Sequence, residues 1–254
     1  MHYTALVERI GRPLVMAHRG ASARAPENTL AAFRLAIEEG ADGVELDTKL
    51  TADGQVVVIH DPTVDRTTGA QGVVRRMTLS QIQALDAGST FQSNFAGERI
   101  PTLAEVFDAL GKDALINIEV ANYAAPFDRL ADAVADLVEQ HQMQGCVIFS
   151  SFHPGNLVRL RKRLPQVAGA LLTLPGKAGW LLRGKLGAIF APALIHPYYT
   201  DVSPSFVQRA HAARRRVNVW TVNQSEDMRR LFKMGIDGII TDDPRLARQV
   251  MEER

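Results

Sequence analysis

Ionisable side chains stand at or near the ends of several short apolar runs in this sequence. The run LVMAH ends on His18, which Arg19 follows directly, and the run VVVIH ends on His60. The runs GVELD and LINIEV carry three acids, which are Glu45, Asp47 and Glu119. The carboxyl ends of parallel strands in a barrel meet at one mouth, where such folds keep their active sites. We therefore expect these side chains to gather in one site.

The three acids predict a site for a divalent cation. Glu45 and Asp47 are two residues apart, so on a strand they point to the same side. Two carboxylates this close repel each other unless a cation lies between them or one is protonated. An unpaired charge at Glu119, in an otherwise apolar strand, would also be costly. Carboxylate oxygens suit a hard cation, Mg²⁺ or Ca²⁺; ion pairs with Arg or Lys across the barrel are the alternative.

His18 and His60 are the candidate acid–base residues, because imidazole changes its protonation near neutral pH. Arg19 is suited to hold a phosphate or carboxylate oxygen through a charge-assisted hydrogen bond. A salt bridge from Arg19 to Glu27 or Glu45 is an equally weighted alternative. This set of side chains indicates proton transfer on a substrate that carries a phosphate or a carboxylate.

His196 and Trp220 are candidate substrate-binding residues. His196 ends the run AIFAPALIH, and Trp220 lies in the run VNVWTVN. A residue near this end of a barrel strand can line the mouth. A place in the apolar core is the alternative for both.

The apolar runs alternate with segments of helical periodicity along the chain. They are rich in Val and Ile, as strands buried on both faces should be. The eight runs cover residues 14–18, 43–47, 115–120, 146–152, 167–173, 188–196, 217–223 and 237–243. Eight strands that are each followed by a helix predict an α/β fold, a (β/α)8 TIM barrel.

The first predicted helix lies in ENTLAAFRLAIEEG, where Leu30, Phe33 and Ile37 share one face. Asn28 is its expected N-cap and Gly40 its C-terminal stop. A second helix is predicted over residues 102–111. Further helices are expected to begin near Pro126, Pro154, Pro204, Ser225 and Pro244.

Residues 51–101 depart from this alternation. An ADG turn before QVVVIH predicts a hairpin, and the remainder is polar and rich in turn residues. We interpret the stretch as a small insertion after the second strand, packed over one end of the barrel. Residues 1–254 are then expected to form a single TIM-barrel domain.

Composition limits the classes of partner. The chain has 254 residues, 46% hydrophobic, and a formal net charge of +1, which gives no reason to expect nucleic acid or an anionic membrane. The most apolar stretch, 179–195, is broken by charges and glycines, so no stable membrane insertion is expected. Residues 1–13 lack the pattern of a signal peptide, which predicts a cytoplasmic protein. The sequence does not determine the oligomeric state, and a homodimer is one option.

Short motifs along the chain together resemble the glycerophosphodiester phosphodiesterase family, most closely its cytoplasmic bacterial branch. They occur in the family's order from residue 15 to 244, and are AHRG, PENT, ELDTKLTADGQVVVIHD, DRTTGAQG, DAGSTF, IPTLAEV, NIEV, SSF, WTVN and TDDP. The resemblance implies a barrel that hydrolyses glycerophosphodiesters to glycerol 3-phosphate and an alcohol. It also implies site roles: metal ligands Glu45, Asp47 and Glu119, acid–base residues His18 and His60, and phosphate contact Arg19.

The chain departs from the family at one position. The family usually has a lysine two residues after the third carboxylate, whereas this chain has Ala121. The cationic side of phosphate binding is therefore the uncertain part of the prediction. A basic loop residue such as Lys177 or Lys185, folded over the mouth, is one substitute.

Other functions remain as alternatives. Proton abstraction next to a carboxylate would usually need acids from successive strands and a lysine base on a strand. A phosphodiester-binding or scaffold protein with little activity would be favoured by loss of the histidines or acids, yet all five are present. Hydrolysis of lysolipids in the manner of a lysophospholipase D is a further alternative, because the apolar stretch 179–195 could meet a lipid. The attacking oxygen, from water or from the substrate's 2-hydroxyl, stays open.

Overall fold

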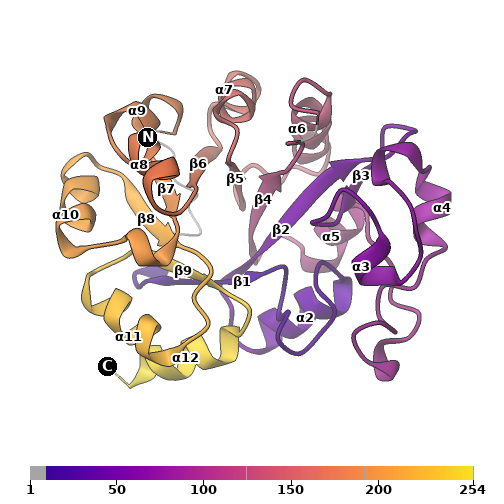
Figure 1. The fold of residues 1–254 in the computed structure, drawn as a ribbon, viewed down its shortest axis with the longest axis horizontal. Helices are drawn as coiled ribbons and strands as arrows, with labels where there is room; N and C mark the ends of the chain where they lie inside the picture. The colour runs from indigo at the N-terminus through magenta and orange to yellow at the C-terminus, as the bar shows by residue number, and fades with distance from the viewer. Residues whose placement is uncertain (1–9, 124, 192, 254) are drawn as a thin grey trace.

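Eight parallel strands form a closed barrel in the computed structural model, which describes residues 10–123, 125–191 and 193–253 (Figure 1). The strands are β1 (Leu14–His18), β2 (Gly43–Leu50), β4 (Leu115–Val120), β5 (Val147–Ser151), β6 (Ala168–Thr173), β7 (Leu194–Pro197), β8 (Arg216–Val219) and β9 (Gly238–Thr241). Each pairs with the next, and β1 pairs with both β2 and β9, which closes the ring. The predicted barrel is confirmed.

The register of the strands decides which side chains become neighbours at the mouth. His18 of β1 is paired with Glu45 of β2, and Asp47 of β2 is paired with Glu119 of β4. All of these pairings are parallel, so the carboxyl ends of the strands point the same way. The residues predicted from strand ends are thereby brought to one edge of the barrel.

Helices lie between the strands around the outside of the barrel (Figure 1). They are α2 (Leu30–Glu38), α5 (Leu103–Leu110), α6 (Leu130–Gln140), α7 (Pro154–Arg163), α8 (Lys177–Arg183), α9 (Lys185–Phe190), α10 (Pro204–Ala212), α11 (Ser225–Lys233) and α12 (Pro244–Glu252). A short 3₁₀ turn, η3 (Tyr199–Asp201), follows β7. Four of the predicted helix starts, at Pro154, Pro204, Ser225 and Pro244, are confirmed.

Local predictions needed three corrections. Thr29, not Asn28, caps α2: its hydroxyl accepts from the Ala32 amide, while Asn28 has a left-handed φ of 57° and turns its side chain elsewhere. The helix expected near Pro126 begins only at Leu130. The run 188–196 is only partly a strand, because its first residues end α9 and β7 begins at Leu194.

The inward face of the barrel is apolar below the mouth. Its buried cluster consists of Leu14, Met16, Leu115, Ile148, Ala168, Ala170, Leu194 and Ile240. Larger apolar clusters fill the space between the strands and the surrounding helices. Apolar packing therefore accounts for the inner floor of the barrel and for the layer between its strands and helices.

The insertion after β2 begins with the predicted hairpin. β3 (Val56–Val58) pairs antiparallel with β2, after the turn that contains Gly54. The chain continues through α3 (Asp65–Thr68), η1 (Val74–Arg76), α4 (Leu79–Gln83) and η2 (Ser93–Phe95). The segment projects beside β2 in Figure 1 and has its own apolar cluster. Its function for the site is to carry His60 to the mouth.

None of the described helices is long and apolar enough to cross a membrane. Residues 1–9, on which part of the prediction about a signal peptide depends, lie outside the described residues.

Candidate active site

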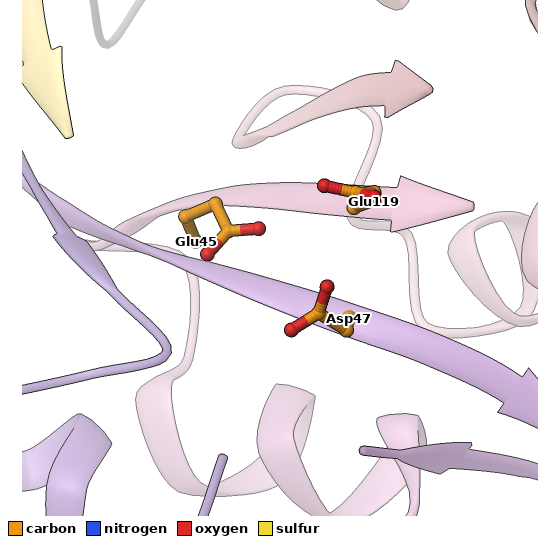
Figure 2. A group of neighbouring side chains, drawn as sticks. All are labelled: Glu45, Asp47 and Glu119. Atoms are coloured by element: carbon orange, nitrogen blue, oxygen red, sulfur yellow. The ribbon is translucent and has the colours of Figure 1, made fainter. Parts of the chain in front are cut away.

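The three predicted metal ligands form a buried cluster of carboxylates at the mouth. Glu45 and Asp47 project from β2 and Glu119 from β4, and Figure 2 shows the three side chains pointing toward one another. They are 4%, 2% and 9% exposed, and one oxygen from each lies within 4.8 Å of the others. The predicted gathering of these acids is present.

Burial and the neighbouring carboxylates raise the pKa of two of these acids, Glu45 and Glu119. Burial raises the pKa of Glu45 well above its usual value, and Asp47 and Glu119 add to the effect. Burial and the charge of Asp47 raise the pKa of Glu119 to about 8. Arg19 opposes both shifts only in part. A divalent cation among these oxygens would keep all three ionised, so the donor set fits a hard metal ion.

The metal-free protein is expected to lose stability as pH rises. The Glu119 carboxyl stays protonated in the folded state up to a pKa of about 8, whereas the unfolded chain ionises near 4.5. The unfolded state therefore binds fewer protons across this window, and the free energy of unfolding falls with pH. Thermal unfolding in chelator from pH 5 to 8 measures the slope. Glu119→Gln should flatten it, and an unchanged slope in that variant would contradict the account.

His18 is held by an acid that the sequence analysis left without a role. Its Nδ1 lies 2.6 Å from Oδ1 of Asp242, which follows β9, and its Nε2 faces Oε2 of Glu45 at 4.0 Å. Ser22 and Asn223 donate further hydrogen bonds to the Asp242 carboxylate. Asp242 therefore fixes the ring so that Nε2 points toward the carboxylate cluster.

His60 is held in a similar way from the insertion. Its Nδ1 lies 2.6 Å from Oδ1 of Asp61, and Arg66 donates to the other Asp61 oxygen over 2.7 Å. The hydrogen bond from Arg66 and then that from His60 lower the pKa of Asp61 to about 2, against the effect of burial. Arg66 also donates to Glu27, which accepts from Arg19. A continuous polar chain thus joins His60 to Arg19.

Arg19 both pairs with an acid and lines the site. Its Nη1 donates to Glu27 over 2.9 Å, so the salt bridge considered as the alternative is present, and its Nε lies 3.3 Å from Oδ2 of Asp47. Its backbone is left-handed, with φ 57°, and its amide donates to Oε2 of Glu45. Asn28 donates to the same Asp47 oxygen. The segment PENT therefore positions both the arginine and a carboxylate.

A cavity of about 70 Å³ connects these groups. His18, Arg19, His60 and the three acids line it together with Asn117, Phe152, Leu172, Trp220 and Ile240. The Trp220 ring meets Phe152 and Tyr198 edge to face, with 5.4 Å between ring centres in each pair. Trp220 therefore belongs to an aromatic wall of the cavity, as one reading of the sequence proposed.

His196 does not line this cavity. Its side chain is 0% exposed, and burial lowers its pKa to about 3, so the ring is neutral. Nε2 lies 3.2 Å from the Asn218 amide nitrogen, and the backbone carbonyl accepts the Trp220 indole N–H over 2.8 Å. The expected direct contact with substrate is thus corrected, because the imidazole is buried and the residue reaches the cavity only through Trp220.

Comparison with known proteins agrees with the geometry. Residues 18–246 match the model of the glycerophosphoryl diester phosphodiesterase family. The chain belongs to this family. A glycerophosphodiester phosphodiesterase of Caldanaerobacter subterraneus is 43% identical over 235 residues, which are 92% of this chain and 95% of the relative. A phosphodiesterase of Oleispira antarctica, solved in complex with the product sn-glycerol-3-phosphate, superposes with a TM-score of 0.86 at 28% identity, covering 96% of this chain and 98% of that one.

As a member of this family, the chain is an enzyme of the phosphoric diester hydrolase class, as the resemblance predicted.

The candidate site contains a residue that the sequence analysis did not predict. Asn117 lies on β4 two residues before Glu119, is 0% exposed and lines the cavity. Among the described residues, neither polar atom of its amide has a hydrogen-bond partner. A buried amide aimed at the cavity without a partner is a free oxygen donor for a cation or a free N–H for a phosphate.

Replacing Asp242 with asparagine is expected to lower kcat by about 10- to 100-fold, the effect of losing an acid that orients an imidazole. The amide keeps the shape of the side chain but no longer stabilises a proton on His18. The measurement is kcat as a function of pH, since the half-maximal pH should also shift. Unchanged kcat and an unchanged profile would make Asp242 a purely structural residue.

Proposed function

We propose that this chain hydrolyses glycerophosphodiesters to sn-glycerol 3-phosphate and an alcohol in a metal-dependent reaction at this cavity. One observation carries the proposal: three buried carboxylates and two histidines, each held by an aspartate, line the same small space. The family and the product complex of the Oleispira relative support the substrate class.

Glu45, Asp47 and Glu119 are the proposed metal ligands, and Asn117 lies where its oxygen would add a neutral donor. The cation is Mg²⁺ or Ca²⁺, since every donor is oxygen. When bound, it would withdraw charge from a phosphoryl oxygen and help to orient the attacking oxygen. Raised pKa values in the cluster support this assignment, because the acids are poorly accommodated without a positive partner.

His18 and His60 move the protons in this proposal. One imidazole takes a proton from the attacking oxygen, and the other gives a proton to the oxygen of the departing alcohol. Asp242 and Asp61 orient the two rings through Nδ1 and leave Nε2 of each free for these transfers. The attacker is water or the substrate's own 2-hydroxyl, and the latter would yield a cyclic phosphate first.

Arg19 and the aromatic wall bind the rest of the glycerol phosphate. Arg19 lines the cavity, and a guanidinium is suited to bind a phosphate oxygen. Phe152, Leu172 and Trp220 offer apolar surface to the glycerol carbons.

A binding protein without activity is not favoured, because the acids and histidines lie around one cavity. Cytoplasmic location and a homodimer stay predictions.

The test is release of glycerol 3-phosphate from glycerophosphocholine and glycerophosphoglycerol, with Mg²⁺ or Ca²⁺ and with chelator. Activity with metal and none in chelator is the expected result. Failure to hydrolyse any glycerophosphodiester under either metal would overturn the proposal. Phosphorus NMR during the reaction shows whether a cyclic glycerophosphate precedes the product.

A further inference from the structure

A second cavity, of about 280 Å³, adjoins the candidate active site. His60 and Glu119 line both cavities. The other walls come from β2, the insertion, and β4 with the segment after it: Lys49, Leu50, Pro62, Val74, Arg75, Ala121, Asn122, Tyr123, Ala125, Asp128 and Leu130. A diester whose phosphate lies at the carboxylates can therefore extend one arm into each cavity.

Ala121 leaves room for this second cavity. It follows Glu119 by two residues, so both side chains lie on the same face of the chain leaving β4. A longer side chain at this position would extend into the space that the alanine methyl lines. The small residue therefore enlarges the site on the side of His60.

Lys49 supplies a cation at the same place from the neighbouring strand. It follows Asp47 by two residues on β2, and its Nζ donates to the carbonyl oxygen of Ala121 over 2.8 Å. An ammonium group has three N–H donors, so two remain for an occupant of the cavity. Lys177 and Lys185, the loop lysines considered from the sequence, are exposed and line neither cavity.

The remaining charges of the cavity favour the same kind of occupant. Arg75 adds a second basic side chain to its wall. Asp128 is the wall's only acid besides Glu119 within the described chain, and its carboxylate accepts from the Asn122 amide and the Leu130 backbone. Leu50, Val74 and Leu130 give an apolar surface. The N–H donors and positive charges of Lys49 and Arg75, together with this apolar surface, suit an occupant that carries hydroxyl groups and is either uncharged or anionic.

Resting on the proposed hydrolysis, we propose that the second cavity binds the alcohol half of the diester and that Lys49 selects polyol or anionic alcohols over ammonium alcohols. The size suits a small head group, since it lies just below the range of typical ligand pockets. Repulsion from Lys49 and Arg75 opposes choline and ethanolamine, whereas hydroxyl oxygens accept the free N–H groups of Lys49.

The position of the second cavity also assigns a different role to each of the two histidines. His60 borders the alcohol cavity, so it protonates the alcohol oxygen as the P–O bond to that oxygen breaks. His18, on the side of Trp220, takes the proton from the attacking oxygen as the new P–O bond forms. The alcohol leaves with the proton of His60, and the phosphate keeps the attacking oxygen.

The test compares glycerophosphoglycerol with glycerophosphocholine in the parent and in Lys49→Met. The parent should prefer the polyol diester in kcat/KM by about tenfold, the scale of one hydrogen bond to a charged group. Lys49→Met should remove this preference, mainly by raising KM for glycerophosphoglycerol. The inhibition constant of sn-glycerol 3-phosphate, which lacks the alcohol half, should change less than twofold in the variant.

Two further variants guard against a folding defect in Lys49→Met. Ala121→Leu fills the cavity and should raise KM for both diesters without changing inhibition by glycerol 3-phosphate. Arg76→Gln, an exposed neighbour that does not line the cavity, is the matched control and should resemble the parent. Equal kcat/KM for the two diesters, or weaker inhibition by glycerol 3-phosphate in Lys49→Met, would overturn this proposal alone. A parent that hydrolyses neither diester would overturn the proposed function and this proposal with it.

Discussion

Asp47→Asn and Glu119→Gln are each expected to lower turnover by at least ~10³-fold, because each removes one charged oxygen ligand from a site that acts electrostatically. Both substitutions keep the size of the side chain, so the barrel should fold as before. The loss should be accompanied by weaker binding of Mg²⁺ or Ca²⁺. Isothermal titration of the metal, measured beside kcat, separates metal loss from a direct effect on the reaction.

Glu38→Gln is the matched control for these variants, since it removes an exposed carboxylate from the surface of α2. Its turnover and metal affinity should equal those of the parent. Full activity of the parent in excess chelator would remove the basis for the metal assignment. Retained metal affinity in both ligand variants would do so as well.

The architecture was accessible from the sequence because apolar periodicity reports burial directly. Buried parallel strands have almost no polar residues, so their ends were visible wherever a histidine or acid interrupted a run. The boundaries failed where two elements share apolar residues. The run 188–196 is apolar up to His196, so its hydrophobicity does not distinguish the end of α9 from the start of β7.

The proposed metal ligands and histidines were easier to predict than the acids that hold the histidines in place. Glu45, Asp47 and Glu119 share a strand face or a strand end, which spacing alone predicts. Asp242 and Asp61 act through contacts with histidines. The contact of Asp242 with His18 spans 224 residues and depends on the pairing of β1 with β9. An acid at the end of the last strand was the only signal for it.

The contact of Lys49 likewise could not be predicted from spacing along the sequence. The sequence shows alanine at position 121 where the family usually has a lysine, and it offers the loop residues Lys177 and Lys185 as substitutes. β2 and β4 are paired neighbours, so the side chains of the two strands meet. Only this pairing places Nζ of Lys49 on the carbonyl oxygen of Ala121, beside the candidate site.

His18→Ala and His60→Ala are expected to keep the metal and to lose at least ~10²-fold in turnover, the usual contribution of a general acid or base. Both histidines line the cavity, but neither is a proposed metal ligand. The affinity for the metal should therefore stay within a few-fold of that of the parent. His211→Ala, on the outer surface, is the control for loss of an imidazole.

The two histidine variants should differ when the leaving group changes. An alcohol that departs readily needs no proton, so an aryl diester should restore turnover in the variant that lacks the general acid and not in the one that lacks the base. From the position of His60 beside the larger cavity, we expect that rescue in His60→Ala. Rescue in His18→Ala instead would reverse the two roles, and near-parent turnover of either variant on a diester with a poor leaving group would make that histidine structural.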